Sequence, residues 1–138
     1  MGDYNLTKED KIELLRIARQ AIVNFVNGSK APRVDENTLS SNLLVPAGAF
    51  VTLKQDGKLR GCTGSFKPEK SLYKVVQSMA IASATEDYRF TPVRLSDIPN
   101  LEIEISVLMP MKQIKSTDEI ILDRHGIFLK KGVCSGTF

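Results

Sequence analysis

The residues best suited to chemistry lie in one short stretch, residues 58–66, with the sequence KLRGCTGSF. Cys62 offers a thiol that can act as a nucleophile, and Arg60 stands two positions before it. Alternation along a strand places both side chains on one face, about 6–7 Å apart, and Leu59 on the other face with the core. A cation at that distance favours the thiolate, which is the reactive form of cysteine. We therefore predict that Cys62 is catalytic and that Arg60 binds a ligand.

Two glycines frame this cysteine. Gly61 and Gly64 lack side chains, which lets a ligand or a second backbone approach, and we predict that both contribute to ligand binding. The opposite interpretation is a close packing point under a helix, with Cys62 as an ordinary buried cysteine. A β-bulge at Gly61 would also reverse the faces and separate Arg60 from Cys62. The residues alone leave both interpretations open.

Four further side chains are candidates outside this stretch. His125 is the single histidine of the chain, so any Cys–His mechanism must use it, and we predict it as a second catalytic residue, the alternative being a simple turn residue. Glu102 and Glu104 share one strand face and are predicted to bind a ligand or transfer protons, unless that face is only solvated. Arg89 is predicted as an anion clamp, or else as the local ion-pair partner of Asp87.

These residues must be positioned by a mixture of helices and strands. Capping residues and apolar spacing predict helices over residues 7–28 and 71–84. Strand patterns predict a hairpin over 49–66 with its turn at Asp56-Gly57, and a last hairpin over 126–138. The segment LEIEISVL, residues 101–108, predicts a strand whose glutamates point outward. Its four inward apolar side chains are Leu101, Ile103, Ile105 and Val107. No strict βαβ rhythm is present, so we predict an α+β fold with a mainly antiparallel sheet packed with helices.

Composition narrows the class of protein. A chain of 138 residues, 42% hydrophobic and 25% charged, fits one globular domain. It contains no apolar run long enough for a membrane span and no export signal, so we expect a cytoplasmic, reduced protein, with a Cys62–Cys134 disulfide as the minor alternative. One histidine and two cysteines do not complete a zinc site without carboxylates, and we predict neither metal nor other cofactor.

A basic region surrounds the first hairpin. The net charge of +3 is mild, and a nucleic-acid surface normally carries more charge with interleaved aromatic residues, so a solvated face is favoured over nucleic-acid binding. The basic residues concerned are Lys54, Lys58, Arg60, Lys67, Lys70 and Lys74.

Four blocks of sequence point to a known family. GAFVTLKQDGKLRGCTGSFKP, ASATEDYRFTPV, LEIEISVL and RHGIFLKKGVCSGTF follow one another in an order and spacing that resemble the AMME chromosomal region protein family. Its prokaryotic members are called protein A of the AmmeMemoRadiSam system. The resemblance covers nearly the whole chain, so we expect a single domain of this family over residues 1–138. LRGC-x-G is its most specific block, whereas Glu86 and Tyr88 depart from the family pattern, in which Asp87, Arg89 and Phe90 do match.

The resemblance implies more than the residues alone indicate. It implies two unequal subdomains with a cleft between them, close to LRGC-x-G. It also implies two partners, a Memo-like protein, which is similar to metal-dependent dioxygenases, and a radical SAM protein. It does not define a reaction. The family pattern continues beyond SGTF with a Leu-Pro-Gln segment and a C-terminal helical region, so we expect that the C-terminal part of the pattern is missing here.

Three functions are consistent with these observations. The leading hypothesis is a cleft-containing protein that binds a small ligand or a modified residue near Cys62 and acts with Memo-like and radical SAM partners. One alternative is a non-enzymatic protein-interaction module in which the glycine-framed turn is structural. The other is nucleotide or nucleic-acid binding through the basic hairpin. An exposed Cys62 sulfur with polar neighbours favours the first hypothesis, and a buried sulfur without them favours the second.

Overall fold

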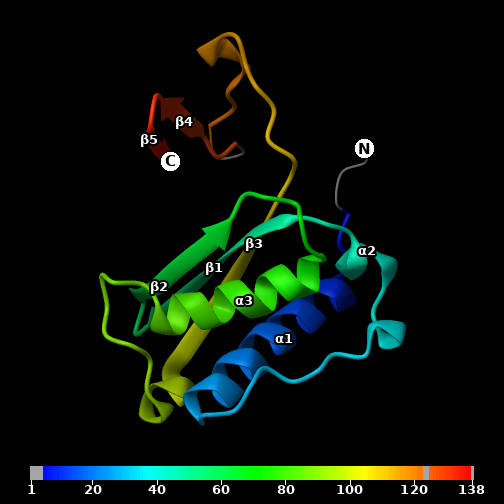
Figure 1. Ribbon diagram of the computed structural model, residues 1–138, viewed down its shortest axis with the longest axis vertical. Coiled ribbons are helices and arrows are strands. Elements are labelled where there is room, and N and C mark those ends of the chain that lie inside the picture. Colours follow the sequence, from blue (N-terminus) through cyan, green and yellow to red (C-terminus); the bar gives the residue numbers. More distant parts are fainter. Residues whose placement is uncertain (1–4, 123–124, 138) are drawn as a thin grey trace.

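Two helices cover one face of a three-stranded antiparallel sheet, and a small hairpin lies beyond its end (Figure 1). The structure is a computed structural model that describes residues 5–122 and 125–137. It confirms the predicted α+β class with antiparallel strands. Its helices are α1 (Lys8–Val26), α2 (Ser41–Leu44) and α3 (Leu72–Thr85), and its strands are β1 (Gly48–Gln55), β2 (Lys58–Ser65), β3 (Leu101–Leu108), β4 (Phe128–Lys131) and β5 (Cys134–Thr137). Short 3₁₀ turns occupy Glu36–Thr38, Leu95–Asn100 and Thr117–Glu119.

The start of α1 is fixed by a capping box. The Thr7 hydroxyl accepts from the Asp10 N–H at 3.1 Å, and the Asp10 carboxylate accepts from the Thr7 N–H at 3.0 Å. Asp10 is buried and also accepts from Ser40 Oγ at 2.6 Å and Asn42 Nδ2 at 2.9 Å. Burial alone would raise the pKa of Asp10, but the hydrogen bonds from Asn42, Ser40 and Thr7 lower it to about 2. One carboxylate therefore joins the first turn of α1 to α2.

Strand β1 is the centre of the sheet, whose strand order is β2-β1-β3. Its Ala49, Val51 and Leu53 are fully buried against the helices, while Thr52 and Lys54 alternate onto the other face. Because no helix covers that second face among the described residues, we call it the open sheet face (Figure 1). The two edges of the sheet are β2 and β3.

The facing predicted for β3 is confirmed. Leu101 is buried, and Ile103, Ile105 and Val107 pack partly buried against the core, whereas the two glutamates between them are exposed. Strand β3 pairs with β1 in unbroken register from Gly48↔Leu108 to Gln55↔Leu101. The period-2 pattern of LEIEISVL thus determined both the strand and its inner face.

The predicted hairpin turn is also present, but a bulge follows it. Asp56 and Gly57 both have positive φ, 53° and 75°, as expected for a tight Asp-Gly turn. Leu53 then pairs with Gly61 and Lys54 pairs with Leu59, so the residue between Leu59 and Gly61 has no partner. The prediction that Leu59 lies in the core is wrong, since its side chain is 41% exposed. The bulge sets Leu59 opposite Lys54, so its side chain lies on the open sheet face instead of the core face.

Residues 109–137 form the smaller of two unequal parts. None of the residues described there is buried, and the predicted last hairpin, β4–β5, carries a 58% exposed Leu129 and a fully exposed Val133. The hairpin reaches the sheet through the Phe66 and Phe128 rings, whose centroids lie 5.4 Å apart. In Figure 1 it stands at the end of the molecule away from α1 and α3. No helix in the described ranges is long and apolar enough to cross a membrane.

Candidate functional site

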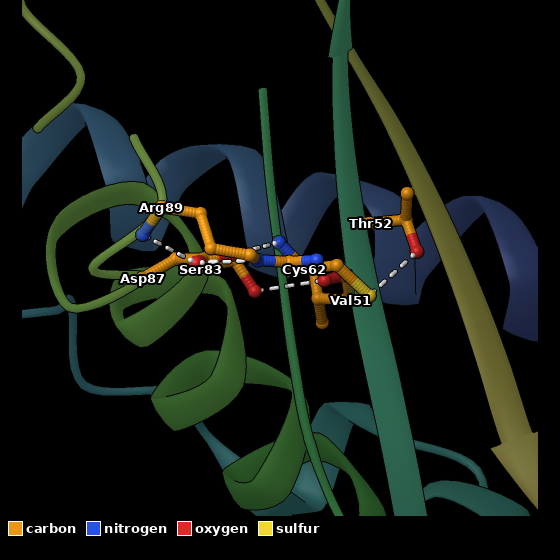
Figure 2. A network of polar contacts seen from close by, with 6 residues as sticks. All are labelled: Val51, Thr52, Cys62, Ser83, Asp87 and Arg89. Carbon is orange, nitrogen blue, oxygen red and sulfur yellow. Dashed lines mark hydrogen bonds and ion pairs between the residues drawn. The ribbon is translucent and has the colours of Figure 1, made fainter. Parts of the chain in front are cut away.

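Cys62 lies on the edge strand β2 with its side chain directed to the open sheet face (Figure 2). Its Sγ lies 3.3 Å from Thr52 Oγ1, and the two residues are direct cross-strand partners. Thr52 is in turn the partner of Glu104 on β3. Cys62, Thr52 and Glu104 therefore form one polar row across the three strands, with the half-buried thiol at the outer end.

The backbone of Cys62 is held from the other side. Its N–H points out of the sheet and donates to Asp87 Oδ2 at 2.9 Å. Asp87 receives two further hydrogen bonds from the Arg89 guanidinium, Nε to Oδ1 at 3.0 Å and Nη2 to Oδ2 at 2.8 Å (Figure 2). The Asp87 side chain is 5% exposed. The edge N–H of Cys62, which has no partner strand, thus donates to a buried carboxylate, and this hydrogen bond fixes the position of the cysteine.

This arrangement strongly favours ionised Asp87. The Arg89 hydrogen bonds hold the pKa of Asp87 well below its ordinary value; burial works against this, and the N–H groups of Cys62 and Arg89 add to it. The same pairing raises the pKa of Arg89, and Cys62 contributes to the rise. The predicted ion pair between Asp87 and Arg89 is confirmed, while the role of Arg89 as an anion clamp stays a prediction.

Gly61 is the point where α3 meets β2. A Cβ atom at this position would lie 2.0 Å from the Ser83 carbonyl oxygen, so only glycine fits under the end of the helix. The buried Ser83 hydroxyl donates to the Val51 carbonyl at 2.7 Å and anchors the same helical turn on β1 (Figure 2). The space that we predicted for a ligand at Gly61 is occupied by the helix.

Gly64 has a similar role on the opposite face. A Cβ atom there would lie 2.3 Å from Cγ of the Phe50 ring, which covers the glycine from the neighbouring strand. Phe50 also contacts Phe66 edge-to-face, with ring centroids 5.1 Å apart. Since Phe66 reaches Phe128, an aromatic chain joins the open sheet face to the β4–β5 hairpin.

Arg60 does not accompany Cys62 as the alternation argument predicted. It is the unpaired residue of the bulge, and its guanidinium bonds to the carbonyls of Thr91 and Pro92 and to Asp97 Oδ2 at 3.3 Å. No hydrogen bond joins Arg60 to Cys62 in the described part of the chain. The reason is the bulge, which redirects the side chain to the connection before β3. The cation on this side of Cys62 is Arg89, which pairs with the Asp87 carboxylate that accepts from the Cys62 N–H.

The remaining predicted residues are divided between two places. Glu102 and Glu104 are exposed on the open sheet face, and Glu104 pairs with Lys54 Nζ at 2.8 Å. His125 lies in the smaller part, where its Nδ1 accepts from the Ile121 N–H at 3.0 Å and its own N–H donates to the Ile121 carbonyl. No contact brings His125 to Cys62 among residues 5–122 and 125–137, so a catalytic pair of the two stays a prediction.

Other chemistry near Cys62 is limited. Both cysteines are free thiols, so the alternative of a Cys62–Cys134 disulfide is wrong for this structure. No group of three or more His, Cys, Asp and Glu side chains in the described ranges could hold a metal ion. Two surface depressions lie elsewhere, one between α1 and residues 32–38 and one between the end of β2 and α3. Cys62 lines neither of them, and the cleft expected beside LRGC-x-G stays a prediction.

Comparison with known proteins identifies the family of this chain. The AMMECR1 family model matches residues 15–138. The chain belongs to the AMMECR1 family. This AMMECR1 chain is 38% identical to Protein MK0488 of Methanopyrus kandleri over 145 residues, which cover 99% of the chain and 69% of that relative. A Methanosarcina mazei relative is 32% identical over 95% of the chain and 69% of its own length.

A solved structure confirms the AMMECR1 fold. The crystal structure of uncharacterized protein PH0010 from Pyrococcus horikoshii superimposes with a TM-score of 0.88 at 34% sequence identity. The match covers 96% of this chain and 70% of the Pyrococcus protein. These relatives are described as uncharacterised or only as proteins, so they establish the family and the fold without a reaction.

Sequence reasoning missed two members of the AMMECR1 site. Thr52 and Ser83 lie in ordinary strand and helix patterns, and nothing in their spacing marks them as partners of Cys62 and Val51. Asp87 was recognised only as a partner of Arg89. Its bond to the Cys62 backbone joins positions 25 residues apart, and only tertiary structure reveals it.

Proposed function

We propose that this chain binds a small ligand or a modified residue on the open sheet face beside Cys62, and that it acts with a Memo-like protein and a radical SAM protein. The observation that supports this proposal is the Cys62 thiol, which lies at the end of a polar row while the buried Asp87 carboxylate, paired with exposed Arg89, holds its backbone N–H. A cysteine that only filled space in the packing would need neither the Thr52 hydroxyl beside its sulfur nor a carboxylate bonded to its backbone N–H.

The polar row can recognise more than one kind of group. Thr52 can donate or accept a hydrogen bond, Glu104 accepts, and Lys54 beside it donates. Phe50 and Phe66 supply an apolar surface at the other end of the same face. The proposed ligand therefore carries polar groups for the row and an apolar portion for the rings. The partners are supported by the family resemblance, and the cleft would be formed over this face.

Binding is tested by NMR with a library of small polar fragments. Amide shifts of ¹⁵N-labelled protein should concentrate at Thr52, Cys62 and Glu104 for at least one fragment. Cys62→Ser should reduce that affinity, whereas the matched Cys134→Ser variant, altered at an exposed cysteine, should not. Shifts that concentrate in either surface depression, or equal effects of both serine variants, would contradict the proposal. Co-purification with the Memo-like and radical SAM proteins of the same genome tests the partners separately.

One observation favours the interaction module as a second candidate. The smaller part exposes apolar side chains that the described residues leave uncovered, among them Leu122, Leu129 and Val133. Nucleic-acid binding gains less support from the structure. Of the six basic residues around the hairpin, Lys54, Arg60 and Lys74 are paired with Glu104, Asp97 and Glu36.

A further inference from the structure

One connection meets strand β2 at two neighbouring residues. Residues 86–97, which we call the strap, run from the end of α3 into the 3₁₀ turn before β3. Near the start of the strap, Asp87 accepts from the Cys62 N–H at 2.9 Å (Figure 2). Further along, the strap contacts the guanidinium of Arg60, two positions before Cys62 on the same strand. The β-bulge allows this, because Arg60 has no partner on β1 and its side chain is free to reach the strap.

The attachment at Arg60 consists of three hydrogen bonds. The guanidinium donates to the carbonyls of Thr91 and Pro92, the latter at 3.2 Å, and to Asp97 Oδ2 at 3.3 Å. The side chains of Arg60 and Asp97 are only 15% and 18% exposed, so solvent screens this ion pair little. A guanidinium carries five N–H donors in a rigid plane and can serve these three separate acceptors at once, whereas a lysine ammonium concentrates its donors at one point.

Asp97 is itself fixed at the end of the strap. Its carboxylate accepts from the Arg94 N–H at 2.9 Å and from Gln55 Nε2 of β1 at 3.5 Å. The bond from the Arg94 N–H lowers the pKa of Asp97, and Gln55 and Arg60 add to this effect, although burial works against it. The carboxylate therefore stays ionised and is held in position to receive the Arg60 guanidinium.

The middle of the strap is joined to the helix instead of the strand. Val93 is buried, and its N–H donates to the Ala84 carbonyl in α3 at 2.7 Å. In the described part of the chain, the hydrogen bonds between the strap and β2 are those of the Arg60 guanidinium and of the Cys62 N–H. Since these two donors are close together on one strand, release of the strap at Arg60 also weakens its hold on Cys62.

We propose that Arg60 is a positioning residue for Cys62, which holds the strap on β2 and thereby keeps Asp87 bonded to the Cys62 N–H. When Arg60 lets go of the strap, Asp87 and its partner Arg89 move away from the sheet edge, and the backbone and thiol of Cys62 lose their fixed position. The strap thus regulates the Cys62 site. Its importance for function rests on the ligand site proposed beside Cys62, whereas the coupling itself is measurable in the protein without ligand.

Amide hydrogen exchange measures the coupling directly. No described strand pairs with the outer side of β2, so protection of the Cys62 N–H depends on Asp87. By alternation, the Thr63 N–H points into the β1–β2 ladder and reports on opening of the sheet. We expect Arg60→Met to accelerate exchange at Cys62 about tenfold relative to Thr63, and Arg60→Lys to have a smaller effect in the same direction. Lys58→Met, which removes an exposed charge from the same strand, is the matched control and should leave Cys62 protected.

Alkylation by iodoacetamide provides a second measurement. Arg60→Met should raise the rate at Cys62 by about two- to fivefold, because the half-buried thiol is no longer held, and should leave exposed Cys134 unchanged. Unchanged exchange at Cys62 would overturn the proposal, and Arg60→Lys decides the question if Arg60→Met does not fold. Parallel acceleration at Cys62 and Thr63, or an equal effect of the Lys58 variant, would also overturn it. Failure of all fragments to bind the open sheet face would instead refute the ligand site and leave this coupling intact.

Discussion

Replacing Gly61 by alanine tests whether the glycine in LRGC-x-G serves packing. The new Cβ would lie 2.0 Å from the Ser83 carbonyl oxygen, more than 1 Å inside ordinary contact. That oxygen belongs to backbone in α3, so the helical turn must move as a unit, and the Ser83–Val51 hydrogen bond is strained with it. Overpacking of this kind costs about 1–3 kcal/mol, and a rigid backbone partner places Gly61→Ala near the upper end.

Urea unfolding at equilibrium measures this cost. We expect the free energy of unfolding to fall by about 3 kcal/mol, with an unchanged m-value and a lower midpoint. Gly57→Ala is the matched control, because its φ is 75° but nothing lies within 4 Å of the added Cβ. Its cost should be only the backbone strain of about 1–2 kcal/mol. If Gly61→Ala changed stability by less than 0.5 kcal/mol, on the order of an ordinary surface substitution, the packing argument would fail.

Three further predictions follow from individual contacts. The pKa of Asp10 is about 2 in the folded protein, below its ordinary value of 3.8. Ionised Asp10 therefore stabilises the folded state by about 1–2 kcal/mol above pH 4, and this stabilisation is lost as the pH falls towards 2. Acid titration of wild type against Asp10→Asn should show this difference shrink at low pH; a constant difference would contradict it. Exposed Cys134 should react with iodoacetamide before half-buried Cys62, and Thr52→Val should change only the rate of Cys62, as read by peptide mass spectrometry. Equal changes at both cysteines would show that the Thr52 contact is irrelevant. Extending the chain with the C-terminal segment of a family relative should raise the melting temperature by several degrees, since 1 kcal/mol shifts a domain of this size by about 2–8 °C; no gain would mean that the segment does not cover the smaller part.

Local sequence patterns predicted those elements whose physics is local. LEIEISVL alternates with period two, so both the strand and its inner face followed from side-chain geometry. The Asp56-Gly57 turn followed equally directly, because both residues tolerate positive φ. Helix α1 could be placed from its Thr7 cap and its apolar stripe.

The site was harder to predict because its contacts are not local. A single bulge separated Arg60 from Cys62, and no residue pattern revealed where the register would shift. The cation that reaches Cys62 through Asp87 is Arg89, which comes from a connection 27 positions further along the chain. Gly61 was recognised as a position of close approach, but the choice between ligand and helix required the position of Ser83.

The uneven burial along the chain has a consequence for how the molecule opens. Every buried residue of the described ranges lies between Asp10 and Leu101, so residues 109–137 can detach without exposing the core. Segments with few buried contacts open locally at a small fraction of the global unfolding free energy. Limited proteolysis should therefore cut first after Leu108 and leave a resistant fragment that holds the whole sheet β2-β1-β3. The Phe66–Phe128 ring contact, which joins the smaller part to the larger one, would break when the smaller part detaches.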